Sequence, residues 1–245
     1  MLNEEEKYRQ LDFMASVVKP WDDLFKLLNK PYCIDPLLGM PIGTARGLVH
    51  AINHQNDILK SEVVNGGLSD ANLRAENAAA FRIRALSNSI KHVQHNPNRY
   101  FSKITGVVSE VQKTTRSSYC FLRNKIEYTF VEKEQSLEEG LTFDLMNDMH
   151  SAIKFWAHKR CIHVKHLKNW KENMPLSKPS NESLVFSALY DPEISLSQKS
   201  IRVQLMEEFC GRFIPLDAPI PSFQVVDSEP PHALIAFVRT YELPV

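Results

Sequence analysis

The chain has 245 residues, of which 43% are hydrophobic and 24% are charged, a composition typical of a soluble globular protein and not of a disordered chain. Its 29 basic and 29 acidic residues cancel, so any attraction to nucleic acid or to a membrane surface must come from a local patch. The acidic start and the lack of an apolar run of about 18 residues predict a cytoplasmic protein with no membrane segment.

The first 100 residues predict three long helices. Apolar residues recur at three- and four-residue steps over residues 4–28, and Pro20 should kink or split that helix. A second helix is expected over residues 44–64, followed by a stop at Asn65-Gly66-Gly67. A third should begin at Ser69 or Asp70 and run to about Gln94, because its alanine-rich first half has high helix propensity.

Further along the chain the apolar period changes to two. Residues 104–111 and 119–131 alternate, and the polar stretch 113–118 between them predicts a β-hairpin near 103–132. An apolar helical stripe then predicts a helix over residues 143–168.

These elements predict a mainly α fold: a helical bundle with an inserted β-hairpin, followed by a small α+β appendage. The bundle should occupy residues 1–172 and the polar, proline-containing stretch 173–183 should form a linker or loop. The appendage should occupy residues 184–245, where short apolar runs surround a helix expected at Gln198–Phe209.

Two polar segments are candidates for function. In the stretch RALSNSIKHVQH, Arg84, Asn88, Lys91 and His95 fall within about 60° of one another on one helix face. Nitrogen-rich side chains in such a row can bind phosphate or move a proton, although a solvated helix face has the same pattern. We expect Asn88, Lys91 and the neighbouring His92 to contact nucleic acid, with Arg84 and His95 as the catalytic pair if the site cleaves RNA.

The second candidate is the segment Ala157–Lys171, which holds five Lys or Arg and three His without an acidic residue. It is predicted either to bind a phosphate backbone or simply to complement the negative end of a helix dipole. Its candidate nucleic-acid contacts are Lys159, Lys165 and Lys168, and its candidate catalytic pair is Arg160 with His166.

No cofactor and no metal are expected. Four cysteines, Cys33, Cys120, Cys161 and Cys210, lie far apart in sequence, which argues against a zinc site or a disulfide framework and favours buried thiols. Although His158, Cys161, His163 and His166 are close in sequence, no return segment supplies the further paired ligands of a closed zinc site. Neither a P-loop nor a G-x-S-x-G motif is present.

The helix sequence RALSNSIKH, a hairpin, and then LTFDLMNDMHSAIKFW resemble a group of uncharacterised bacterial proteins with a HEPN-like helical bundle, over residues 45–160. The resemblance implies either a metal-independent ribonuclease of toxin–antitoxin or phage-defence systems, or a non-catalytic module that binds RNA or a protein partner. It also implies a homodimer, because HEPN-like proteins commonly pair their motif helices across a two-fold axis.

The catalytic version of that family carries an Arg followed by a His after four to six residues. Arg160 and His166 have five residues between them, but Cys161 stands where a polar residue is expected; Arg84 and His92 have seven, which is too many. We therefore expect a non-catalytic module, with a metal-independent endoribonuclease as the alternative. In the alternative, His would take the 2′-OH proton and Arg would stabilise the charged phosphorane.

Overall fold

The computed structural model of the chain describes residues 4–29, 39–63, 66–92, 98–113, 119–164, 167, 185–190, 202–209, 212–216, 224–228 and 237–242. Its helices are α1 (Glu4–Phe13), a π-helical turn (Met14–Val18), α2 (Lys19–Leu28), α3 (Gly39–Glu62), α4 (Asp70–Glu76), α5 (Ala78–Lys91), a 3-10 turn (Leu137–Glu139) and α6 (Leu145–Lys159). Its strands are β1 (Phe101–Lys113), β2 (Tyr119–Val131), β3 (Leu141–Asp144), β4 (Val185–Tyr190), β5 (Arg202–Phe209), β6 (Arg212–Pro215), β7 (Gln224–Ser228) and β8 (Phe237–Glu242).

The chain divides into two compact units, and each unit is assembled from separate stretches of sequence. Unit 1 comprises Met1–Phe25, Gly43–Thr105 and Glu127–Asn173; unit 2 comprises Lys26–Ile42, Gly106–Ile126 and Met174–Val245. Strands β1 and β2 each contribute residues to both units. The linker predicted at 173–183 lies outside the described residues.

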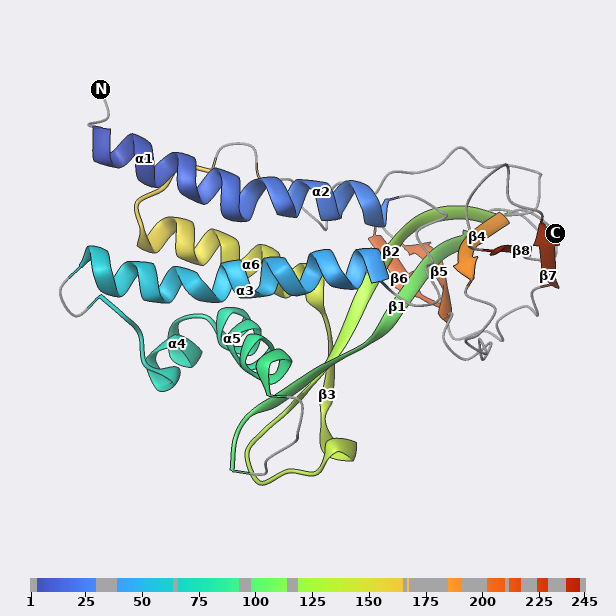
Figure 1. Cartoon of the computed structure of the whole chain (residues 1–245). Helices are drawn as coiled ribbons and strands as arrows, with labels where there is room; N and C mark the ends of the chain where they lie inside the picture. Colours follow the sequence, from blue (N-terminus) through green and yellow to red (C-terminus); the bar gives the residue numbers. More distant parts are fainter. Residues whose placement is uncertain are drawn as a thin grey trace. The chain divides into compact units, whose positions relative to one another are not determined.

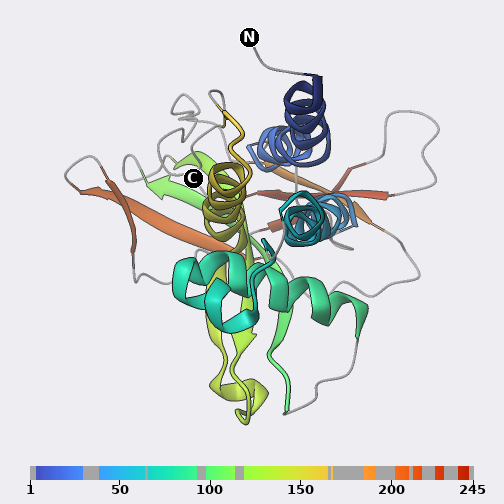
Figure 2. The same cartoon turned by 90° about the vertical axis from the view of Figure 1, so that its left-hand side faces the viewer.

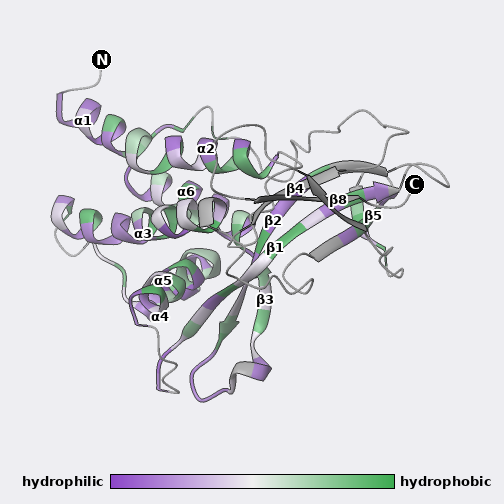
Figure 3. Cartoon of the chain, turned by 45° about the vertical axis from the view of Figure 1, so that its right-hand side comes forward, coloured by the Kyte–Doolittle hydropathy of each residue, from purple (hydrophilic) through white to green (hydrophobic). Residues whose placement is uncertain are grey.

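Unit 1 holds the helical core. Helices α1, α3 and α6 run side by side with nearly parallel axes (Figures 1 and 2). Hydrophobic and hydrophilic residues alternate along these helices (Figure 3), as expected where one face packs and the other meets water. The core includes the fully buried side chains of Phe13, Trp21, Leu48, Ile52, Leu73, Ile83 and Trp156.

Local sequence explains where the helices bend and begin. The π-helical turn Met14–Val18 lies just before Pro20, which cannot donate a backbone hydrogen bond, so the predicted interruption of the first helix is confirmed as a change of helix type. Ser69 caps α4, since its side chain accepts a hydrogen bond from the Asn72 amide. Asp144 caps α6 by accepting from the amides of Met146 and Asn147.

Three predicted helices have different bounds from those expected. The helix expected over residues 44–64 begins five residues earlier, because α3 spans Gly39–Glu62. The helix predicted from residue 69 to about 94 is broken at Asn77, which is extended (φ −153°) and whose side chain accepts a hydrogen bond from the Ala80 amide. The helix predicted to reach residue 168 ends at Lys159, because Arg160 leaves the helix and Cys161 adopts a left-handed conformation (φ 53°).

The sheet corrects the predicted fold class. The chain has an α+β fold, not a mainly helical bundle with an inserted hairpin. Strands β1 and β2 are neighbours, as predicted, but they form the middle of a five-stranded sheet with the order β3-β2-β1-β5-β6. Strand β3 pairs antiparallel with β2, and β5 pairs parallel with β1, with Glu110 opposite Gln204. Strands β4, β8 and β7 form a separate antiparallel sheet.

The helix predicted at Gln198–Phe209 is wrong, because residues 202–209 form β5. The sequence RVQLMEEF contains good helix formers, and long-range pairing with β1 overrides that preference. Leu205 and Met206 are both buried, so both faces of the strand pack at this point.

Candidate functional site

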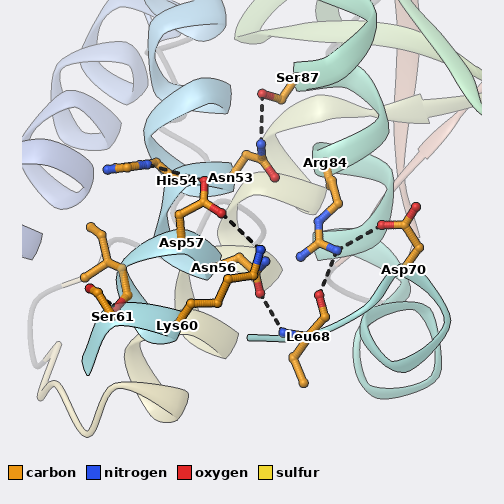
Figure 4. A network of polar contacts seen from close by, with 11 residues as sticks. Asn53, His54, Asn56, Asp57, Lys60, Ser61, Leu68, Asp70, Arg84 and Ser87 are labelled. Carbon is orange, nitrogen blue, oxygen red and sulfur yellow. Dashed lines mark hydrogen bonds and ion pairs between the residues drawn. The ribbon is translucent and has the colours of Figure 1, made fainter. Parts of the chain in front are cut away.

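Helices α3 and α5 share a group of polar side chains, here called the α3–α5 polar cluster: His50 and Asn53 on α3, with Arg84 and Ser87 on α5. Ser87 is fully buried, and its hydroxyl oxygen accepts a hydrogen bond from Asn53 Nδ2 at 3.3 Å (Figure 4). The same hydroxyl lies 2.8 Å from His50 Nδ1. A buried hydroxyl needs such partners, so Ser87 joins the two helices through polar contacts.

The environment of His50 favours its neutral form. Partial burial lowers the pKa of His50 below the ordinary value of 6.5, and the positive charge of Lys91 lowers it further. Lys91 lies one helical turn beyond Ser87 on the same face of α5, which explains its influence on the ring. Sequence analysis missed His50, because only the fold brings α3 beside α5.

Arg84 is largely enclosed, with a side chain that is 11% exposed. Its Nη1 donates to the carbonyl of Leu68 (3.1 Å) and to Asp70 Oδ1 (2.9 Å), as Figure 4 shows. The amide of Leu68 in turn donates to Asn56 Oδ1 on α3. Arg84 Nη2 is buried and has no hydrogen-bond partner among the described residues. Arg84, the predicted catalytic cation, therefore uses its Nη1 to connect α5 to Leu68, just before α4, and to Asp70, the first residue of α4.

The end of α5 is different, because its polar side chains are exposed. We call Asn88, Lys91 and His92 the α5 terminal cluster. Lys91 makes no ion pair with any other described residue. The helix ends at Lys91, short of the predicted end near residue 94, and the predicted fourth member of the row, His95, lies outside the described residues.

Two more exposed cations, Arg99 and Lys103, lie around the start of β1, which contacts the last turn of α5. Ser89 Oγ accepts a hydrogen bond from the Ser102 amide at 2.9 Å, which brings the start of β1 to the last turn of α5. Arg99 and Lys103 flank this contact in sequence, and both are exposed. In the described part of the chain neither side chain has an ion-pair partner. The sequence pattern did not single out these two exposed cations.

The second predicted site is arranged differently. Arg160 is buried, and its Nε and Nη2 donate to the two carboxylate oxygens of Glu62 at 3.0 and 2.6 Å. Its Nη1 donates to Gln55 Oε1 and lies 4.0 Å from the carboxylate of Asp12. These contacts occupy the guanidinium with partners from α1 and α3.

The neighbours of Arg160 give no further support for a site in the described residues. Lys159 pairs with Glu76 and lies over the ring of Phe155. Cys161 is exposed, contrary to the expectation of a buried thiol. Lys165, His166 and Lys168 lie outside the described residues. Within the described part of the chain, no group of three or more His, Cys, Asp or Glu side chains is placed to hold a metal ion.

One buried polar triad was not foreseen from sequence. Arg82 donates from Nε and Nη2 to Asp148 at 2.7 and 2.8 Å, and the hydroxyl of Tyr128 also donates to that carboxylate. Burial and the nearby Asp148 charge raise the pKa of Tyr128, which therefore stays protonated. The guanidinium also lies 4.1 Å from the ring centroid of Phe143. Since Tyr128 is fully buried, the triad joins α5, α6 and β2 rather than meeting a ligand.

Comparison with protein families, curated proteins and solved structures finds no match to the chain. Among the described helices, none has both the length and the apolar character needed to cross a membrane.

Proposed function

We propose that the chain is a non-catalytic, HEPN-like module that binds RNA through exposed cations at the end of α5 and around the start of β1, with Asn88 and His92 of the α5 terminal cluster beside them. One contrast carries the proposal: Lys91, Arg99 and Lys103 are exposed and have no acidic partner among the described residues, whereas carboxylates within unit 1 bind Arg84 and Arg160. Free cations can neutralise phosphates, whereas an arginine in a buried ion pair must lose that pair first.

The chemistry of such a surface favours modest, salt-dependent binding. Each lysine or arginine that neutralises a phosphate releases counterions, so affinity falls as salt rises. Asn88 and His92 add hydrogen-bonding groups beside Lys91. Because the whole chain carries no net charge, attraction should be confined to this local surface. A cytoplasmic location, expected from the sequence, would give the module access to RNA.

The alternative, a metal-independent endoribonuclease, has less support. A catalytic arginine must reach the charged phosphorane, and three donors of Arg160 already bind Glu62 and Gln55. A role in toxin–antitoxin or phage-defence systems is compatible both with RNA binding and with RNA cleavage. A protein partner or a second copy of the chain would be the alternative occupant of the same surface.

The test is binding of a fluorescein-labelled single-stranded RNA, followed by fluorescence anisotropy in EDTA at several salt concentrations. We expect salt-sensitive binding without cleavage, weakened in Lys91→Ala and in Lys91→Ala/Lys103→Ala. Lys154→Ala, at an exposed position on α6, is the matched control and should bind like wild type.

Two results would contradict the proposal. Cleavage of the RNA in EDTA would support the endoribonuclease, and its loss in Arg84→Ala or Arg160→Ala, once circular dichroism has shown that the variant is folded, would identify the arginine concerned. Absence of salt-sensitive binding would direct the search to a protein partner. Light scattering after size exclusion would then show whether that partner is a second copy, since one chain has a mass of 28.1 kDa.

A further inference from the structure

The hydrogen bonds around Ser87 determine which ring nitrogen of His50 carries the proton. Asn53 Nδ2 can only donate, so at this contact Ser87 Oγ is the acceptor. The hydroxyl proton of the fully buried Ser87 then needs an acceptor of its own. Among the described contacts, His50 Nδ1 at 2.8 Å fills that role. The bonds therefore run from Asn53 to Ser87 and from Ser87 to His50.

This order gives His50 a defined neutral tautomer. A neutral imidazole has one N–H, and because Nδ1 accepts, the proton must be on Nε2. His50 is only partly buried, and its Nε2 has no hydrogen-bond partner among the described residues. The outer nitrogen is thus a directed donor that a ligand can reach.

Lys91 places a positive charge near the His50 ring. Ser87 and Lys91 are four residues apart on α5, so the lysine lies one turn beyond the serine that contacts His50. A neutral N–H donor next to an ammonium group suits a ligand with several acceptor oxygens and negative charge. A phosphate group has both properties.

We propose that His50 Nε2–H and Lys91 Nζ bind the same phosphate group of the RNA backbone, with Asn53 and Ser87 orienting the histidine. This inference rests on the RNA-binding function proposed above and names the phosphate-contacting pair of that site. It also fits a module that does not cleave: a general base must accept the 2′-OH proton, whereas this arrangement keeps a proton on the available nitrogen.

The tautomer and the phosphate contact can be tested without RNA. Long-range ¹H–¹⁵N NMR on histidine-labelled protein should show His50 protonated on Nε2 and not on Nδ1, with the two tautomers mixed in Ser87→Ala. Titration with inorganic phosphate should shift the His50 ring signals more than those of His54, an exposed histidine on the same helix. Sodium chloride of equal ionic strength is the control. A proton on Nδ1, or no greater phosphate response at His50 than at His54, overturns the proposal.

The second arm uses the labelled RNA. His50→Ala should weaken binding about tenfold, the loss expected for a hydrogen bond to a charged group. His50→Gln should retain more affinity, because its amide nitrogen can replace Nε2 as donor, and His54→Ala should bind like wild type. Circular dichroism melts check that each variant is folded.

The outcomes separate the two proposals. If Lys91→Ala weakens RNA binding but His50→Ala does not, the RNA-binding function stands and the histidine contact is wrong. The wild-type protein could show phosphate-dependent shifts of the His50 ring signals and yet not bind RNA. In that case His50 and Lys91 form only an adventitious site for free phosphate. That result refutes both the RNA assignment and the inference built on it.

Discussion

Arg160 is a buried cation whose described partners are side chains of unit 1. Its side chain is 1% exposed and that of Glu62 is 14% exposed, so removing the guanidinium leaves a largely buried carboxylate unpaired. We expect Arg160→Ala to lower the free energy of unfolding by about 3 kcal/mol. Urea denaturation followed by circular dichroism measures this loss.

The neighbouring residue provides the control for that measurement. Lys159 pairs with Glu76 at the surface, where the two side chains are 32% and 38% exposed, so Lys159→Ala should cost below about 1 kcal/mol. The double variant Arg160→Met/Glu62→Met should recover most of the lost stability, since apolar replacement of a buried ion pair is often tolerated. Equal effects of Arg160→Ala and Lys159→Ala would show that the Arg160 pair is not a buried structural contact.

His50 should give the stability of the protein a specific pH dependence. Its pKa in the folded chain is lowered below the ordinary 6.5, so protonation favours the unfolded chain. The stabilisation is fully present above about pH 6.5 and is lost as the pH falls through the lowered folded-state pKa. Burial is the larger cause of the lowered pKa of His50, and the positive charge of Lys91 adds to it.

The measurement compares urea unfolding of wild type and His50→Gln at about pH 7.5 and about pH 5. Both chains contain the other histidines, so the difference between them isolates His50. We expect wild type to lose more stability on acidification than His50→Gln. If wild type loses no more stability on acidification than His50→Gln, the fold does not lower the pKa of His50.

At the scale of single elements, Asn77 determines where α4 ends and α5 begins. Its Oδ1 accepts from the Ala80 amide at 2.8 Å, and its Nδ2 donates to Ser151 Oγ at 3.3 Å. Asn77→Ala should destabilise the fold by about 1 kcal/mol, because the first turn of α5 loses its cap.

Asn77→Ser separates the two contacts of Asn77, since serine can cap a helix but lacks the amide that reaches Ser151. We expect this variant to melt close to wild type, and Asn77→Ala to melt several degrees lower. If both variants melt at the same reduced temperature, the contact with Ser151 stabilises this region and the cap does not.

Local signals allowed much of the helical part of the fold to be predicted, and long-range contacts explain what was missed. Ser69 as a cap, the interruption near Pro20 and the pair of strands β1 and β2 follow from short patterns in the sequence. Residues 202–209 form a strand because they pair with β1, nearly 100 residues earlier in the chain. The local sequence of this stretch contains no signal for that pairing. His50 likewise belongs to the candidate site only because the fold brings α3 beside α5, where its ring contacts Ser87.

At the scale of the whole molecule, the two units are interleaved along the chain. Unit 2 contains residues 26–42 and 106–126, which lie in sequence between stretches of unit 1. It also contains the residues after 173. In unit 2, β1 pairs with β5, and Val108, Val111, Leu205 and Met206 are all buried at or near that pairing. A cut near residue 173 would therefore remove the partner of β1 rather than a self-contained appendage.

This arrangement makes a definite prediction for a chain of residues 1–173, which contains the whole stretch 1–172 that the sequence pattern predicts to be a bundle. Without β5, the apolar side chains of β1 lose cover and its backbone becomes an open edge, which favours association between chains. We expect the shortened chain to bind more of the dye ANS than the full chain and to elute as mixed oligomers in size exclusion, while far-UV circular dichroism retains the helical signal of unit 1. A monodisperse shortened chain with unchanged ANS binding would show instead that residues 174–245 form a separable domain.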